Sequence, residues 1–405
     1  MCRKQEEVEM CERLAIGAMT RREFAKGAVA AILLLVVGSA FADPLNPDTD
    51  WMVGKVGAFM HYLPGLERSD VIRNFDVEGL KRQLVEINAD FFIFTLGQNE
   101  NYYNAPNSAF GKIAGTEAKT RFAKRDIPAE LIAALKGTGI RFGLYSPCQP
   151  SFADEVAEEM FGFGRQQSLT TRDWLMTDSG AANWANVLEE WAVRYGDSVD
   201  IWWFDGARPD MAFSEKHARM YREALHKGNP RMVMTFNWGL LDWGIGAWAA
   251  YEEKCRNDPG FAIKKPFREF DWQYQGLSLV KGCPPDDPAS WHGGKLTRIV
   301  LQQWTESADF TSGESDQPFR FMPNGRWYNG NQHFLLTYLG HYWGTKRCRY
   351  PDEIWIKFLK RYLANGGCIC LDMGIDLETG LFCAEHRRQF RRIMGALRSR
   401  SAARN

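Results

Sequence analysis

A helix and the strand that follows it are encoded in residues 125–147, RDIPAELIAALKGTGIRFGLYSP. Asp126 is placed to cap the free amides of the helix, Pro128 fits its first turn, and Gly139 can end it. The next seven residues, 141–147, are apolar nearly throughout, as expected of a strand that is covered on both faces. This order of helix and strand predicts an α/β fold with a parallel sheet.

The same alternation continues in both directions along the chain. Short apolar runs predict strands at 55–63, 90–97, 141–147, 200–206, 231–237, 303–310, within 333–343 and at 366–374. Amphipathic segments between them predict helices at 75–87, 125–139, 185–195, 214–227, 351–365 and 382–400. Residues 240–300 have weak periodicity and hold Trp, Pro and Gly, which predicts long loops over one end of the sheet.

Polar residues repeatedly follow the predicted strands, as His61, Gln98 with Asn99, Asp205 and Asn237. In a closed barrel the carboxyl ends of all strands meet at one mouth, where such residues form an active site. A doubly wound sheet would more often carry a glycine-rich phosphate turn after its first strand, and none occurs there. We therefore predict a (β/α)8 TIM barrel that forms a single catalytic domain.

Composition narrows the classes of partner. The 405 residues carry 50 basic and 50 acidic side chains, so nucleic acid is not an expected partner. Fifteen Trp residues suit both a core and the stacking of sugar rings, and for any single Trp both roles are open. The nine Cys form no CxxC pair or Cys/His cluster with metal-ligand spacing, so no metal site is predicted.

The N-terminus has the features of an export signal. Residues 20–26, TRREFAK, match the twin-arginine pattern, an apolar run covers 28–37, and Ala40-Phe41-Ala42 forms a cleavage signal. The apolar run is shorter than the roughly 20 residues that span a bilayer, so we expect cleavage and no stable membrane anchor. The prediction is a signal peptide over 1–42 and a barrel over 43–405, located in the periplasm or secreted.

Asp205 ends the run IWWFDG (201–206), in which bulky side chains lead to a carboxylate on a flexible turn. A carboxylate walled by aromatic rings suits attack on a glycosidic carbon, because the rings stack on the sugar and the anion meets the developing positive charge. An Asp at the end of a strand can equally cap the next helix, so the residues alone leave both roles open.

Four segments resemble the α-L-fucosidases of glycoside hydrolase family twenty-nine, in the order in which the family has them. They are AFMHY (58–62), the stretch 125–147 quoted above, VLEEWAVRYGDSVDIWWFDGA (187–207) and NGGCICLDMGIDLETGLF (365–382). Their family counterparts are "LFIHW", a helix with a "KFGLYYS"-like strand, "EL...YG.....WFDG" and "NGNLLLNIGP...G.I". The resemblance runs from about Lys55 to Leu397.

This resemblance implies a barrel with retaining glycosidase activity, in which Asp205 is the nucleophile and His61 binds the sugar. A retaining enzyme needs a second carboxyl roughly 5 Å from the nucleophile. Glu314, in a segment that resembles the family's "TPE", is the first candidate for this acid/base. The alternatives are Glu269 and Glu252 or Glu253.

The chain also departs from the family. Gln98 and Asn99 stand where the family has the His pair that holds fucose hydroxyls; amides also bind a diol, but fucose specificity is left open. Tyr328 stands where the "WE" segment has its Glu, and no C-terminal β-sandwich is expected. Side chains predicted to contact sugar, with packing as the alternative for each, are Tyr103, Trp203, Arg208 and Trp343.

Three functions follow as hypotheses. The first is an exported retaining hydrolase that cleaves a terminal fucose or related sugar from a glycan, with no metal or organic cofactor. The second is a carbohydrate-binding barrel without catalysis, and the third is a glycosidase that acts on a different sugar. The expected partner is a carbohydrate in each case, and no oligomeric state is predicted.

Overall fold

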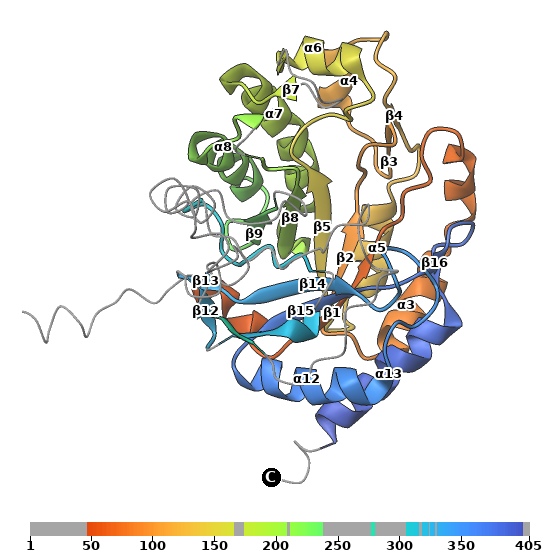
Figure 1. Cartoon of the computed structure of the whole chain (residues 1–405). Helices are drawn as coiled ribbons and strands as arrows, with labels where there is room; N and C mark the ends of the chain where they lie inside the picture. The colour runs from red at the N-terminus through yellow and green to blue at the C-terminus, as the bar shows by residue number, and fades with distance from the viewer. Residues whose placement is uncertain are drawn as a thin grey trace, which may run out of the picture. The chain divides into compact units, whose positions relative to one another are not determined.

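Seven parallel strands form one curled sheet in the computed structural model (Figure 1). The described residues are 47–165, 174–208, 211–237, 277–279, 305–315, 318–323, 325–328 and 330–399. The strands of the sheet are β1 Val56–Met60, β2 Phe91–Thr95, β5 Arg141–Pro147, β8 Ile201–Asp205, β9 Val233–Phe236, β14 Phe334–Tyr338 and β15 Cys368–Asp372. These seven confirm seven of the eight predicted strands.

The order of strands in the sheet is β14-β15-β1-β2-β5-β8-β9. The last strand of the sheet in the sequence, β15, therefore pairs with the first, β1. Each pair is parallel; for example, Gly57 of β1 lies between Cys370 of β15 and Phe91 of β2. This cyclic order and the curl of the sheet are those of a TIM-like α/β barrel. The two strands left at the edges are β9 and β14.

A segment without regular strand structure, residues 309–315, hydrogen-bonds to both edge strands. Asp309 N–H donates to Met234 O of β9 at 2.8 Å, and Leu336 N–H of β14 donates to Gly313 O at 2.9 Å. The predicted strand at 303–310 is therefore wrong in its placement, since no strand is assigned within 305–315. The backbone is irregular because Gly313 adopts φ +63° and the Thr311 hydroxyl takes the place of a backbone partner for Phe334.

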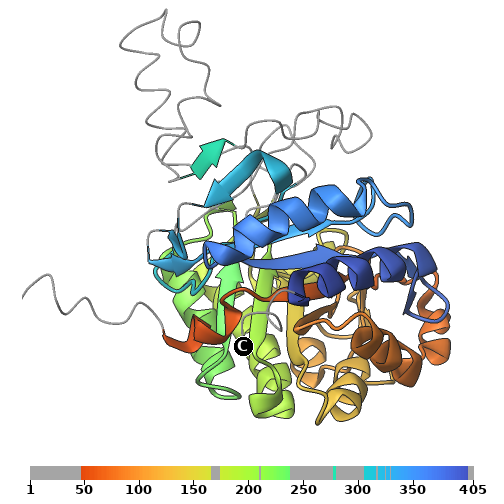
Figure 2. The same ribbon diagram turned by 90° about the horizontal axis from the view of Figure 1, so that it is seen from below.

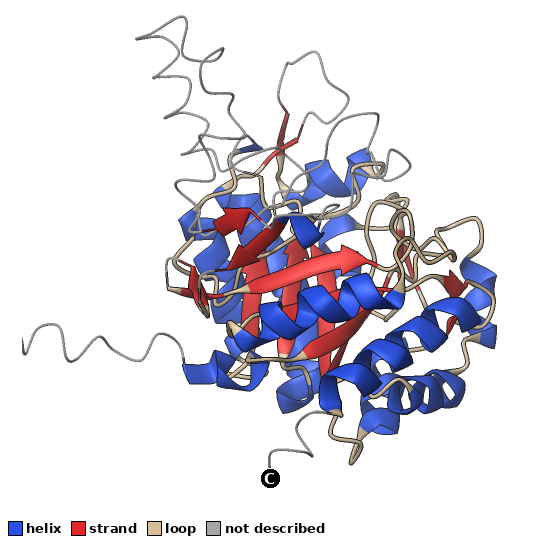
Figure 3. Ribbon diagram, turned by 60° about the horizontal axis from the view of Figure 1, so that its bottom comes forward, coloured by secondary structure: helices blue, strands red, loops and turns tan. Residues whose placement is uncertain are grey.

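Helices cover the outer face of the sheet (Figure 3), and the last two lie side by side (Figure 2). They are α3 Val77–Glu86, α4 Ser108–Ala114, α5 Ile127–Leu135, α6 Glu155–Phe161, α7 Asp178–Tyr195, α8 Glu215–His226, α12 Asp352–Ala364 and α13 Ala384–Arg398. All six predicted helices are confirmed. Asp126 caps α5 as predicted, by accepting from Ala129 N–H, but the helix ends at Leu135, before the predicted Gly139.

Short strand pairs lie outside the main sheet. They are β3 Tyr102–Tyr103 with β4 Arg121–Phe122, β6 Gly164–Arg165 with β7 Trp174–Leu175, β10 Leu277–Leu279 with β11 Phe321–Pro323, β12 Trp327–Tyr328 with β13 Asn331–Gln332, and β16 Ile375–Asp376 with β17 Leu381–Phe382. Except for 277–279, the predicted loop region 240–300 lies outside the described residues.

Alternate residues of each strand belong to two separate cores. One core fills the inside of the curl and contains Phe59, Tyr145, Trp203, Phe334 and Cys370. The other lies between the sheet and the helices and contains the neighbours of these residues, such as Met60 and Trp202. Because side chains alternate between faces, a polar residue two positions beyond an inner-core residue stands above the inner core.

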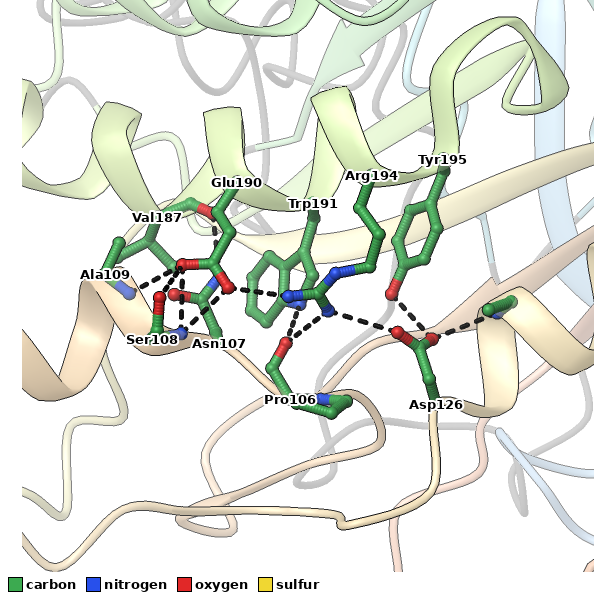
Figure 4. Close-up of polar contacts among 11 residues, drawn as sticks. Pro106, Asn107, Ser108, Ala109, Asp126, Val187, Glu190, Trp191, Arg194 and Tyr195 are labelled. Atoms are coloured by element: carbon green, nitrogen blue, oxygen red, sulfur yellow. Dashed lines mark hydrogen bonds and ion pairs between the residues drawn. The ribbon is translucent and has the colours of Figure 1, made fainter.

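A polar network fastens the loop after β3 to α7 (Figure 4). Glu190 accepts from the N–H and hydroxyl of Ser108, and Arg194 donates to Glu190 at 2.6 Å. Arg194 also donates to Asp126 at 3.1 Å, and the Tyr195 hydroxyl donates to Asp126 at 2.9 Å. These contacts hold the segment that leaves β2 against the helix that leads into β8.

The described residues from Asp48 onward belong to one compact unit. Within the described ranges, no helix has both the length and the apolarity to cross a membrane. The predicted signal peptide, 1–42, lies outside the described residues, and export stays a prediction.

Candidate active site

Four hydrogen-bond donors surround the carboxylate of Asp205 at the end of β8. Oδ2 accepts from the Tyr145 hydroxyl at 2.6 Å and from Gln98 Nε2 at 3.0 Å. Oδ1 accepts from Gly206 N–H at 2.9 Å and from Asn237 Nδ2 at 3.0 Å. All four of these contacts come from donors among the described residues, and the oxygens of a carboxylate can accept from each of them.

The local backbone explains why Asp205 is displayed and does not cap a helix. Gly206 follows it at φ +80°, a conformation that favours glycine, and this turn directs the Gly206 N–H back to the carboxylate. Asp205 O accepts from Cys148 N–H, and Asn237 N–H donates to Phe204 O, so the neighbouring strand ends fix the turn on both sides. Asp205 thus stands half-buried above the inner core, two residues beyond Trp203.

Tyr145 is the donor closest to Asp205, and its role was not predicted. Its ring is 2% exposed and stacks on Trp203 with ring centroids 5.3 Å apart. Burial, followed by the charge of Asp205, raises the pKa of Tyr145 well above its usual value, so the hydroxyl keeps its proton. Gln98 Nε2 also donates to the Tyr145 hydroxyl, at 2.6 Å. Tyr145 therefore acts as a neutral donor to the carboxylate.

A second carboxyl group, Glu314, lies next to Asp205. Asn237 Nδ2 donates to Asp205 Oδ1 at 3.0 Å and to Glu314 Oε2 at 2.6 Å, so these two oxygens are separated by no more than the sum of the two distances. Glu314 is 9% exposed and comes from the irregular segment 309–315. This upper limit is compatible with the separation of roughly 5 Å that a retaining glycosidase needs.

His61 forms the opposite side of the mouth together with Asp372 at the end of β15. His61 Nδ1 lies 3.1 Å from Asp372 Oδ1, and Gly344 N–H donates to Asp372 Oδ2 at 2.7 Å. The imidazole contacts the rings of Trp343 and Tyr145, with centroid distances of 5.3 and 5.8 Å. Through Tyr145, this cluster is continuous with the one around Asp205.

Glu100, two residues beyond Gln98, is a fourth carboxyl near the mouth, after Asp205, Glu314 and Asp372. Its Oε2 is buried and has no hydrogen-bond partner among the described residues. Burial raises the pKa of Glu100, and the charge of His61 opposes that shift. A carboxyl that holds its proton to a higher pH than usual is a candidate general acid.

The structure brings together only part of the predicted site. His61, Gln98, Asp205 and Glu314 converge, and Trp343 covers His61. Trp203 is 2% exposed and donates to Ser312 O, so it packs beneath Asp205. The ranges 252–253 and 269, which held the alternative acid/base residues, lie outside the described residues.

Three other predicted residues are placed less directly. Tyr103 is fully buried in the outer core, where it stacks on Phe122 at 5.3 Å, so the structure does not bring it to the mouth. Asn99 is half-buried, and its carbonyl accepts from the Ser151 hydroxyl at 2.8 Å. Arg208 is half-buried, and its N–H donates to Gly206 O in the turn after Asp205.

Signals in the sequence could have identified two of the missed residues. Asp372 ends an apolar strand, CICLD (368–372), as Asp205 ends IWWFD. Tyr145 lies on the inner face of β5, in register with Trp203 of β8. Glu100 follows no such pattern, because it lies in a loop. Within the described part of the chain, no three His, Cys, Asp or Glu side chains gather as metal ligands do.

Comparison with known proteins shows the fold. No protein-family model and no curated protein matches the chain. The endo-fucoidan hydrolase P5AFcnA, of glycoside hydrolase family 107, shares 13% identity at a TM-score of 0.56, over 87% of this chain and 93% of that one. The α-L-fucosidase AlfC from Lactobacillus casei, in complex with α-L-fucose, shares 13% identity at a TM-score of 0.52, over 89% and 100%.

Three further matches are to longer endo-fucoidan hydrolases of family 107. One of them, MfFcnA4, shares 14% identity at a TM-score of 0.52, over 85% of this chain. The chain spans 54%, 52% and 63% of the lengths of these three structures. At such identities the likeness establishes the TIM-like α/β architecture that the sequence predicted, and the chemistry of the site is argued from its own residues.

Proposed function

We propose that the chain is a retaining glycoside hydrolase that acts on α-L-fucosides or other fucose-containing glycans. The observation that carries the proposal is the pair Asp205 and Glu314, joined by the amide of Asn237 above the inner core. Likeness in fold to an α-L-fucosidase and to endo-fucoidan hydrolases supports the choice of sugar. In this proposal, residues 309–315 take the place of the eighth barrel strand.

The reaction has two steps. A carboxylate oxygen of Asp205 attacks the anomeric carbon while the bond from that carbon to the leaving oxygen breaks, and Glu314 gives its proton to the leaving oxygen. Glu314 then takes a proton from water, the water oxygen attacks the same carbon, and the ester bond to Asp205 breaks. The donors around Asp205 hold the carboxylate in place for attack.

The nucleophile is tested with Asp205→Asn, which keeps the shape of the side chain. We expect kcat/KM on 4-nitrophenyl α-L-fucoside to fall by at least about 10³-fold, with the thermal unfolding midpoint of the wild type retained. Asp200→Asn is a matched control, since Asp200 immediately precedes β8, at the end of the strand away from Asp205, and its carboxylate binds Arg141. Equal rates for wild type and Asp205→Asn would reject the nucleophile.

The acid/base has two candidates, because burial raises the pKa of Glu100, whereas Glu314 shares the Asn237 amide with Asp205. Glu314→Gln should slow natural glycosides about 10²- to 10⁴-fold and spare dinitrophenyl glycosides, whose leaving group needs no proton. Glu100→Gln should change both substrates alike. The opposite pattern assigns the proton to Glu100.

A glycosidase for another sugar is favoured by one observation. Gln98 uses its amide hydrogens on Tyr145 and Asp205, so only its Oε1 is left for a hydroxyl. Turnover of a panel of nitrophenyl glycosides separates this function from fucoside cleavage. Binding in calorimetry without turnover of any member would instead favour the carbohydrate-binding barrel.

We also propose export through the twin-arginine pathway, which the motif at 20–26 supports. The test is N-terminal sequencing of the exported protein, for which we expect a start near Asp43. Loss of export in Arg21→Lys, Arg22→Lys would support the pathway, and unchanged export would reject it.

A further inference from the structure

We propose that Asp372 is a positioning residue that sets specificity: it orients His61 so that the ring accepts a hydrogen bond from one sugar hydroxyl, and it fastens the turn that carries Trp343. The inference rests on the proposed function. It concerns the side of the mouth opposite Asp205, and it adds a required substrate group to the reaction described above.

Strand alternation places the side chain of Asp372 inside the curl. Cys368 and Cys370 of the same strand belong to the inner core, and Asp372 is the next residue on that face. It pairs with Phe59 of β1, and His61 lies two residues beyond Phe59. Asp372 is 1% exposed, so its carboxylate meets the imidazole within the protein and away from bulk water.

A count of donors and acceptors assigns the proton on His61. Asp372 Oδ2 accepts from Gly344 N–H at 2.7 Å, and Oδ1 lies 3.1 Å from His61 Nδ1. An ionised carboxylate has no proton to give, so Nδ1 is the donor in this contact. In the neutral imidazole the other nitrogen, Nε2, is then an acceptor.

That tautomer selects the substrate. The His61 side chain is 17% exposed at the mouth, and its ring contacts the buried Tyr145 and the half-buried Trp343, of which Trp343 can also contact a sugar ring. An acceptor Nε2 requires a hydroxyl hydrogen on the sugar opposite it. A sugar that lacks this hydroxyl, or carries a methyl ether there, leaves Nε2 without a donor and binds less well.

The second oxygen of Asp372 fastens the turn at the end of the loop after β14. Gly344, at φ +68°, gives its N–H to Asp372, and the adjacent Trp343 lies on the His61 ring. The carboxylate of Asp372 thus holds both the imidazole of His61 and the turn that carries Trp343. His61 and Gly344 contact different oxygens of Asp372, and in Asp372→Asn one of these oxygens becomes an NH2 group, which cannot accept from the donor opposite it.

The first test compares sugar recognition in wild type, Asp372→Asn and the control Asp200→Asn, in which the altered carboxylate immediately precedes β8 and binds Arg141. The substrates are 4-nitrophenyl α-L-fucoside and its monodeoxy and mono-O-methyl derivatives. In wild type, we expect one position whose loss lowers kcat/KM about 10- to 100-fold, chiefly through KM. In Asp372→Asn, the loss at that position should shrink to less than about 3-fold, while Asp200→Asn keeps the wild-type pattern. Unchanged discrimination in folded Asp372→Asn would overturn the proposal.

The second test needs no activity, so it separates this inference from the proposed function. Nitrogen-15 NMR of histidine-labelled protein, with His61→Gln to assign the signal, reports which ring nitrogen carries the proton. We expect the Nδ1–H form of neutral His61 in wild type and a mixture of both forms in Asp372→Asn. An Nε2–H form in wild type would overturn the proposal, even if fucosides are cleaved.

Discussion

Two carboxyl groups, Asp205 at the end of β8 and Glu158 on α6, differ in what surrounds them. Asp205 is half-buried and accepts from four donors. Glu158, on α6, is fully buried, accepts from Gln149 Nε2 at 3.1 Å, and has no partner for Oε2 among the described residues. Burial raises the pKa of Glu158 to about 9. This difference indicates that hydrogen-bond donors at the ends of strands allow the fold to hold a carboxylate near its core.

Asp205 and Glu158 are also linked by a short series of contacts. Cys148 N–H donates to Asp205 O at 2.9 Å, and the next residue is Gln149, which binds Glu158. Glu158 faces Asp154, whose charge adds to the rise of its pKa, and its own charge acts on Tyr103 and Tyr221. Substitutions at or near Asp205 and Glu158 test whether hydrogen-bond donors account for the difference between the two carboxyl groups.

The largest expected effect on stability is that of Glu158→Gln. Glu158 stays protonated in the folded state up to about pH 9, whereas in the unfolded chain it ionises near its ordinary pKa of 4.5. The unfolded state therefore binds fewer protons in this window, and the stability of the wild type falls as pH rises. Glu158→Gln has no such loss. Its free energy of unfolding, relative to that of the wild type, should therefore increase by about 1.4 kcal/mol per pH unit between pH 5 and 8.

Urea unfolding at pH 5, 6, 7 and 8 measures this difference. Glu159→Gln is the matched control, because Glu159 is the next residue of α6 and is exposed. A constant difference between wild type and Glu158→Gln across the four pH values would show that Glu158 is ionised in the folded protein. The contrast with Asp205 would then be lost.

Tyr145→Phe removes one of the four donors from Asp205. We expect kcat/KM on nitrophenyl fucoside to fall about 10- to 100-fold, because the donor at 2.6 Å holds the carboxylate in position and Gln98 loses an acceptor. The stack on Trp203 survives, so the unfolding midpoint should change little. Steady-state kinetics and thermal unfolding measure both effects, and an unchanged rate would show that three donors suffice.

The smallest expected effect is that of Asp126→Ala, at a carboxylate that has donors but lies outside the mouth. Asp126 accepts from Ala129 N–H, the Tyr195 hydroxyl and Arg194. Loss of this helix cap should lower the free energy of unfolding by about 1 kcal/mol and leave kcat/KM unchanged. A loss of activity without a loss of stability would mean that the network in Figure 4 positions the mouth as well.

Much of the fold could be predicted because its signals are local. The apolar runs of β1, β2, β5, β8 and β9 and the cap of α5 are visible in the sequence, and the structure confirms them. The segment 309–315 could not be placed, because its pairing depends on Thr311 and Gly313 meeting the backbone of Phe334. Those contacts join residues whose proximity only the curled sheet creates.

The site was predictable where a polar residue ends a strand, as Asp205 and His61 do. In the sequence, Tyr103 fits a sugar contact as well as it fits packing. In the structure, β3 places its ring in the outer core, beside Phe122. Asp372 also ends a strand and could have been identified in the same way, but its contacts with Gly344 and His61 join distant segments, and Glu100 was missed because it lies in a loop. Sequence alone does not bring those partners together.

The central claim is that Asp205 forms a covalent bond to the sugar. A direct test incubates the protein with 2-deoxy-2-fluoro-α-L-fucosyl fluoride, which slows hydrolysis of the intermediate, and locates the added mass by peptide sequencing in a mass spectrometer. If Asp205 is the nucleophile, we expect one fluorofucosyl group, attached to the carboxylate of Asp205, and none in Asp205→Asn. A label on Glu314, on Glu100 or on any other side chain would contradict it.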